Sequence, residues 1–225
     1  MKHDTLLSGS PGWIVPLVLA VAVAAGACNT SAPEDGGGGS GTDVSATVAL
    51  GWAAWEAADY TTAFDHFEDA FNQNTTSAEA RNGLGWAELF LGNMSAAIYH
   101  FDYAMYLELP VFDAHLGMAI ALRDSAHYSN AILTAEQILA AIPRYEFSHR
   151  PSINYKDLRL LIAACAIRRG ENYFDLAQTN VDSLDPANGL DPEVPASWIV
   201  GGVTYATYPE ALIKKIEALE AVIDP

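Results

Sequence analysis

The segment YTTAFDHFEDA, residues 60–70, recurs twice more along the chain at a fixed step of 34 residues. Four columns of small or apolar residues repeat in this way. They are Tyr60, Met94 and Tyr128; Ala63, Ala97 and Ala131; Phe67, Phe101 and Ala135; and Ala70, Ala104 and Ile138. These positions lie on one stripe of an α-helix, and a helix that repeats at this period is one half of a stacked hairpin. The pattern therefore predicts an all-α array of helical hairpins.

A Leu-Gly pair precedes each copy of the segment. The three pairs are Leu50-Gly51, Leu84-Gly85 and Leu116-Gly117. Glycine costs a helix about 1 kcal/mol relative to alanine, so close approach of a partner helix is the expected reason for keeping it. In the third copy the pair stands two residues further from the repeated segment. We therefore expect Ser125 and Ala126 to lengthen the third turn.

With these residues in place, the chain resembles the tetratricopeptide repeat (TPR) family. The family pattern is W-x2-L-G-x2-Y, then A-x3-F-x2-A, then a proline that ends the second helix. The resemblance covers about residues 45–143, where Pro143 is the closing proline, and a degenerate fourth copy is expected from Tyr155 to Leu184 with Gly170 at its turn. It implies a TPR-like α-α superhelix of three to four hairpins over residues 44–188, followed by a capping helix.

Residues 1–27 are predicted to be an export signal peptide. The apolar run from Trp13 to Ala27 has the length of a signal-peptide core and is shorter than the roughly 20 residues that span a bilayer. The run ends in AGAC at residues 25–28, which resembles the lipobox of bacterial lipoproteins. The same residues satisfy the A-x-A rule of ordinary signal peptidase. Both interpretations cut the chain before Cys28.

A lipid on Cys28 is the favoured fate of that residue. Residues 28–43 would then form a lipid-anchored, Gly-rich tether that cannot bury a core. Several acyl chains, palmitate among them in the lipoprotein family, hold a protein durably on a membrane. Asn29 suits passage to the outer membrane, which predicts a place in the cell envelope, facing the periplasm or the cell surface. The alternative is a disulfide with Cys165, which is otherwise expected to be a buried free thiol.

The charge of the chain limits its partners. Lys and Arg total 11 against 28 Asp and Glu, and the formal net charge is -17. Such a surface repels nucleic acid and anionic head groups, because both are bound through clustered Lys and Arg. No nucleic-acid partner is expected. With 51% hydrophobic residues, the mature part is expected to form one domain with a continuous core.

The TPR resemblance implies a concave groove formed by the first helix of each hairpin. The residues it places there as a partner-binding surface are Trp52, Trp55, Glu56, Asn82, Trp86, Leu89, Phe90, Met118 and Leu122. This groove would be unusually apolar, since it lacks the Lys and Arg clamp of many peptide-binding members. The aromatic residues are either core between packed helices, or a groove filled by the C-terminal segment of the chain or by an apolar partner.

The C-terminal region divides into a loop and a helix. Residues 190–208 are apolar but interrupted by Pro and Gly, so they are expected to form a long loop that lies against something, the groove being the candidate. Pro209 is expected at the first position of a helix that continues to Ile223 with an apolar stripe. Residues 189–225 are thus interpreted as an apolar loop and a capping helix. A detachable docking helix is the alternative.

The sequence offers little that would support catalysis. His66 and His100 occupy equivalent positions, but neighbouring helices place such side chains about 10 Å apart, too far to share a metal. No zinc-protease, phosphate-loop or nucleophile-elbow motif is present. We therefore expect no catalytic residue, cofactor or metal, and a membrane-anchored scaffold for protein–protein interactions in the envelope. The alternatives are a carrier or chaperone for an apolar ligand or peptide, and a hydrolase that uses the carboxylate-rich face.

Overall fold

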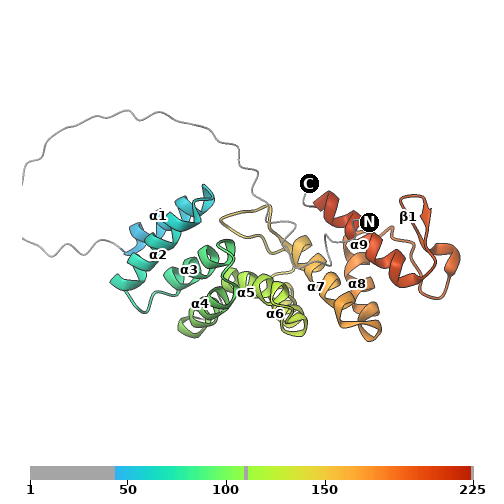
Figure 1. The fold of residues 1–225 in the computed structure, drawn as a ribbon, viewed down its shortest axis with the longest axis horizontal. Helices are drawn as coiled ribbons and strands as arrows, with labels where there is room; N and C mark the ends of the chain where they lie inside the picture. The colour runs from blue at the N-terminus through green and yellow to red at the C-terminus, as the bar shows by residue number, and fades with distance from the viewer. Residues whose placement is uncertain (1–43, 109–110, 224–225) are drawn as a thin grey trace, which may run out of the picture.

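The computed structural model describes residues 44–108 and 111–223. The predicted signal peptide, the tether and Cys28 lie outside the described residues. Four hairpins of adjacent α-helices stack side by side in the described part (Figure 1). They are α1 (Val44–Glu56) with α2 (Tyr60–Gln73), α3 (Ala78–Phe90) with α4 (Met94–Leu107), α5 (Phe112–Asp124) with α6 (Tyr128–Ala141), and α7 (Tyr155–Arg169) with α8 (Phe174–Leu184). A 3-10 turn, Glu171–Tyr173, precedes α8.

The first three hairpins repeat at a constant step of 34 residues. Their first helices begin at residues 44, 78 and 112, and their second helices at residues 60, 94 and 128. The third turn, residues 125–127, is three residues long like the other two, so the expectation that Ser125 and Ala126 lengthen it is wrong. The Leu116-Gly117 pair lies two residues earlier in its own helix instead. The true equivalents of Leu50 and Gly51 are Met118 and Ala119.

Each of the first three turns ends its helix with the same pair of backbone hydrogen bonds. In the first turn, the Ala58 N–H donates to Trp55 O and the Asp59 N–H donates to Ala54 O, both at 2.9 Å. This is the Schellman arrangement, which requires a left-handed residue after the helix. That residue is Ala58 (φ 61°), Gly92 (φ 85°) or Ala126 (φ 61°). Two of the three turns thus place alanine where glycine is the unstrained choice.

Two phenylalanine rings explain the glycines of α1, α3 and α5. Phe67 of α2 lies between α1 and α3, and a Cβ added to Gly51 or Gly83 would come within 2.6 or 2.3 Å of its ring. Phe101 of α4 lies in the same way between α3 and α5. The expected close approach is therefore confirmed, and what approaches is the ring of a second helix. The corresponding distances to Phe101 are 2.5 Å from Gly85 and 2.1 Å from Gly117.

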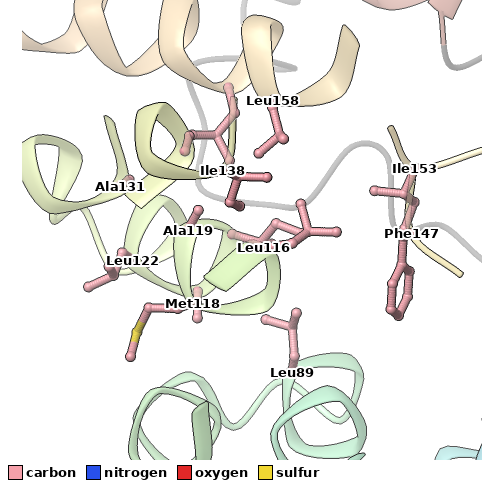
Figure 2. Packing of buried hydrophobic residues seen from close by; sticks show 14 of the residues in the cluster. Leu89, Leu116, Met118, Ala119, Leu122, Ala131, Ile138, Phe147, Ile153 and Leu158 are labelled. Carbon is pink, nitrogen blue, oxygen red and sulfur yellow. The ribbon is translucent and has the colours of Figure 1, made fainter. Parts of the chain in front are cut away.

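The core runs along the whole array. Figure 2 shows Leu116, Ile138 and Leu158, from α5, α6 and α7, packed toward one another. The face by which one hairpin packs on the previous hairpin is buried in the interior of the array, where Leu84 is 2% exposed. Its equivalent in α1, Leu50, is 55% exposed, because no described segment precedes the first hairpin.

The regular step breaks after the third hairpin. Helix α7 begins nine residues later than a 34-residue step from α5 would place it. The extra residues belong to segment 144–154, which we call the strap. The strap doubles back on itself, since the Phe147 N–H donates to Ile153 O at 2.9 Å and the Tyr155 N–H donates to Tyr145 O at 2.7 Å. Drawn in ochre between α6 and α7, it extends above α3 toward α1 (Figure 1).

Residues 190–208 lie at the other end of the molecule from α1 (Figure 1). They contain a 3-10 turn, Pro195–Ser197, and a small antiparallel sheet of β1 (Ile199–Val200) and β2 (Val203–Thr204). Gly201 and Gly202, with φ of 58° and 79°, form the two-residue turn between the strands, as such hairpins favour. The segment adjoins α8, where Gln178 Nε2 donates to Leu190 O at 3.2 Å. The hypothesis that it fills the groove is wrong.

Helix α9 (Tyr208–Ile223) covers the last hairpin, as a capping helix should. Its residues Ala211, Leu212 and Ile216 are buried, and it packs on α7 and α8. Lys215 Nζ lies 2.5 Å from Asp185 Oδ2, which ties the helix to the end of α8. Pro209 stands at the second helical position instead of the first. Among the described helices, none has the length and apolar character needed to cross a membrane.

Gly51 and Gly83 face the ring of Phe67 from two helices, an arrangement that we call the Phe67 clamp. The clamp predicts that the effect of an added methyl group on stability depends on its position. Gly83→Ala should lower the free energy of unfolding by about 1–3 kcal/mol, because the fully buried ring has Gly51 on one side and Trp52 at 5.0 Å and cannot move aside. Gly189→Ala is the control, since no atom lies within 4 Å of the added Cβ, and it should change stability by about 0.5 kcal/mol at most. Urea unfolding of both variants measures this. Equal effects would show that the clamp is not tight.

The Schellman turns predict a stabilising change to glycine. Ala126→Gly should raise the free energy of unfolding by about 0.5 kcal/mol, because relief of the left-handed alanine outweighs the extra entropy of the unfolded glycine. Gly92→Ala, in the equivalent turn, should lower it by about 1 kcal/mol. Thermal and urea unfolding supply both numbers. A loss of stability in Ala126→Gly would contradict the left-handed geometry of that turn.

Candidate functional site

The residues predicted to form the groove bring an aromatic surface together on α1 and α3, and this surface is called the groove below. Trp55 and Trp86 are fully buried there, and their rings meet edge to face at 5.6 Å. Phe147 of the strap packs against both rings. Its ring stacks on Trp86 at 4.4 Å and meets Trp55 edge to face at 5.6 Å. The groove is therefore closed by a side chain from a different part of the same chain.

The next strap residues continue this contact toward the rim. His149 stacks face to face on Trp52, with ring centroids 3.6 Å apart, and its Nδ1 lies 3.0 Å from Glu56 Oε1. The guanidinium of Arg150 lies over the ring of Trp55 at 4.5 Å and near that of Phe90 at 5.2 Å. A cation over an aromatic face is attracted by the negative potential of the ring. Both strap side chains thus bind aromatic surface directly.

Three carboxylates, one from each of the first three hairpins, border the strap. Asp113 of α5 accepts hydrogen bonds from Tyr145 Oη and from Ser148 Oγ, the latter at 3.2 Å. Burial, and then the charge of Asp113, raise the pKa of Tyr145 far above its ordinary value, so that its hydroxyl stays a donor. Glu56 of α1 and Glu79 of α3 are the other two.

Glu79 lies beside these groups but bonds to the groove wall. It accepts a hydrogen bond from Trp52 Nε1 at 2.7 Å. Surrounding protein raises the pKa of Glu79 by desolvation, while the Trp52 bond and the charge of His149 act in the opposite direction. Asp113 adds a like charge nearby. A positive group in the groove therefore relieves repulsion among acidic residues.

The floor of the groove also holds buried polar atoms without ordinary hydrogen bonds. Nε1 of Trp86 has no partner within the described part of the chain, and the side chain of Asn82 interacts with Glu79 without a hydrogen bond of ordinary geometry. Asn82 and Trp86 are one turn apart on α3, on the same face as Glu79. A buried polar atom left unpaired costs about 1–3 kcal/mol. The strap ring that stacks on Trp86 offers no hydrogen bond to its Nε1.

The predicted groove residues fall into two sets. Trp52, Trp55, Glu56, Trp86 and Phe90 contact the strap, and Asn82 shares a face with Trp86.

Leu89, Met118 and Leu122 are buried core residues. In the third repeat the equivalent of Trp52 and Trp86 is Ile120, since the step is 34 residues, and Met118 corresponds to Leu84. The role of the predicted set in partner binding stays a prediction.

Sequence reasoning missed the strap residues and two of the three carboxylates. They are Tyr145, Phe147, His149, Arg150, Glu79 and Asp113. The available signal was the failure of the repeat step after residue 143, together with three aromatic or imidazole rings at alternate positions 145, 147 and 149. Such alternation favours an extended segment with one buried side.

The histidines considered as metal ligands lie elsewhere. His100 Nδ1 lies 2.8 Å from Nη1 of Arg81 and accepts a hydrogen bond from it, so the imidazole is neutral. Desolvation by burial, and then the charge of Arg81, lower the pKa of His100 to about 4. Within residues 44–108 and 111–223, no group of three potential ligands could hold a metal ion. Cys165 is a buried free thiol, as expected, and burial raises its pKa to about 12.

Comparison with known proteins places this geometry in a known fold. No family model matches the chain, and no curated protein matches it in sequence. Similar solved structures are MamA 41-end from Desulfovibrio magneticus RS-1 (17% identity, 83% of this chain and 99% of that chain, TM-score 0.53) and YrrB, a TPR protein with an unusual peptide-binding site (12%, 80% and 87%, TM-score 0.54). A thermophilic TPR protein of Thermus thermophilus is also similar (17%, 80% and 90%, TM-score 0.51). The chain therefore has the TPR-like, all-α fold that its sequence predicts.

Proposed function

We propose that this protein is a membrane-anchored scaffold that binds another protein of the cell envelope through the concave groove of its TPR-like array. One observation carries the proposal: the groove already holds a piece of polypeptide, the strap. Aromatic stacking, carboxylates and a cation over a ring are interactions that recognise a peptide segment.

The likeness to YrrB supports a polypeptide as the ligand. That protein has a peptide-binding site and shares the fold over 80% of this chain. At 12% identity the likeness concerns the fold, so peptide binding is carried to this chain as part of the proposal. The groove contacts described above are the independent support from this chain itself.

The location follows from the sequence that precedes α1. A lipid on Cys28 would leave a tether of residues 28–43, whose Gly-rich chain gives a typical end-to-end distance of roughly 20 to 24 Å. That reach lets the array turn over the membrane surface to meet a partner. Because the net charge is -17, anionic head groups repel the surface of the array. The outer membrane, with the array facing the periplasm or the cell surface, is the proposed site.

The proposed role is binding without chemistry. Each carboxylate that borders the groove already has a partner. Asp113 accepts a hydrogen bond from Tyr145, Glu79 accepts one from Trp52, and Glu56 pairs with His149. These contacts position polypeptide and present no nucleophile with its base. A carrier of small apolar ligands receives no specific support, because Phe147 already packs against the rings of Trp55 and Trp86.

Charge reversal in the groove should abolish partner capture. Glu56→Lys with Glu79→Lys should deplete the captured envelope proteins at least tenfold relative to wild type, because the groove would repel a cationic segment and lose the Trp52 bond. The measurement is quantitative proteomics after cross-linking in intact cells.

Glu68→Lys with Glu136→Lys makes the same charge change at exposed positions on α2 and α6, and should retain the partners. All variants are first shown to unfold cooperatively. Identical partner lists for the two double variants would mean that the groove is not the binding surface.

The lipid anchor gives a separate prediction. Cys28→Ser should move the protein from the membrane fraction to the soluble fraction, because the acyl chains supply the membrane affinity. Fractionation measures the shift, and mass spectrometry of the wild-type N-terminal peptide should show an acylated cysteine at residue 28. Membrane association that persists in Cys28→Ser, or an unmodified cysteine, would contradict the anchor.

A further inference from the structure

The strap is bound in the groove much as a ligand would be. Its residues alternate between buried and exposed from 145 to 148: Tyr145 and Phe147 are buried, and Glu146 and Ser148 are exposed. His149, the next residue on the groove side, is half-buried on Trp52. This period of two is that of an extended chain over residues 145–147. A turn, in which the Arg150 N–H donates to Phe147 O at 3.1 Å, then brings His149 and Arg150 onto the tryptophan rings. The groove thus contacts the side chains at positions 145, 147 and 149.

Each of these positions has a chemical requirement. The first meets Asp113 and takes a hydroxyl donor. The second lies against Trp86 and Trp55 and takes a flat aromatic ring. The third lies on Trp52 beside Glu56 and takes a planar side chain with a ring nitrogen that faces the carboxylate. A guanidinium follows over Trp55.

Resting on the proposed function, we propose that the partner presents an aromatic and cationic segment of this pattern, which enters the groove in place of strap residues 145–150. The strap is thus both the resting occupant of the groove and a template for its partner.

Charge complementarity selects this class of partner. Glu56, Glu79 and Asp113 border the groove, on a chain with 28 acidic residues. The sequence contains only 11 Lys and Arg residues. Two of them, Arg144 and Arg150, belong to the strap, together with His149. A cationic segment is attracted to the groove, and an acidic one is repelled.

The strap is built so that exchange is possible. It is an insertion between the third and fourth hairpins, and its two legs bond to each other, so it can leave without breaking a helix. It also leaves Trp86 Nε1 without a hydrogen bond from the described residues. A partner that accepts a hydrogen bond from this atom gains roughly tenfold in affinity over the strap.

The test opens the groove without altering its walls. Phe147→Ala with His149→Ala, made in the full chain, removes the two largest strap contacts. The probe is a fluorescent synthetic peptide of residues 144–151, RYEFSHRP. We expect it to bind the opened variant at least tenfold more tightly than wild type, because in wild type the tethered strap competes at an effective concentration in the millimolar range. Fluorescence anisotropy gives both dissociation constants.

Control peptides, and variants of the groove carboxylates, test whether the peptide binds through the contacts described above. A peptide with alanine in place of its phenylalanine, and one with glutamate in place of both arginines, should each bind the opened variant at least tenfold more weakly. Glu56→Gln with Asp113→Asn in the opened background should weaken the unaltered peptide similarly. If the opened variant does not fold, His149→Ala alone is judged by the same comparisons.

Absence of binding by an opened variant that keeps native circular dichroism and cooperative unfolding would overturn the proposal, as would equal binding of the control peptides. The proposed function fails separately. If the peptide binds as expected but groove charge reversal leaves the captured proteins unchanged, the inference about groove chemistry stands and the scaffold role of the groove falls. If capture depends on the groove but the peptide neither binds nor competes, the scaffold stands and the strap is only a structural cover.

Discussion

The spacing of the hairpins depends on two phenylalanine rings, each held between a pair of glycines. Phe67 and Phe101 stand where any Cβ on the facing helices would overlap the ring, so the helices approach as closely as ring thickness allows. The two clamps are identical in design and 34 residues apart, and they set α1, α3 and α5 in one orientation. Because that orientation is shared, Trp52 and Trp86 come to face the same concave side. The groove is a consequence of the clamps.

The third interface lacks the clamp, and there the molecule departs from regularity. Ala135 replaces the phenylalanine and Ala119 replaces the glycine that would make room for it, so small residues fill the contact from both sides. The next hairpin then begins nine residues late, and the inserted chain returns over the first two hairpins as the strap. The regularly spaced first two hairpins form the groove, and the irregular connection after the third hairpin, the strap, occupies it.

The hairpins, the fourth repeat and the capping helix could be predicted because each buries a periodic stripe, and periodicity is a local property of sequence. The register of the third repeat could not be read from its Leu-Gly pair, since glycine occurs in two columns: Gly51 faces one side of a ring and Gly83 the other. Gly117 belongs to the second column. The strap was beyond such reasoning because its contacts join distant residues. His149 and Glu56 are 93 positions apart, and no local pattern records that pairing.

The strap covers aromatic residues that would otherwise be exposed among acidic side chains. Trp52, Trp55 and Trp86 left open would form an exposed aromatic patch bordered by like charges, which is a liability for aggregation and a cost in repulsion. A cationic, aromatic segment removes both problems at once, and the strap is such a segment. Yet its fit is incomplete, because Trp86 Nε1 remains without a partner in the described structure. The strap therefore stabilises the free protein by shielding the rings. A polypeptide that also accepts a hydrogen bond from this buried donor would bind with a more favourable free energy.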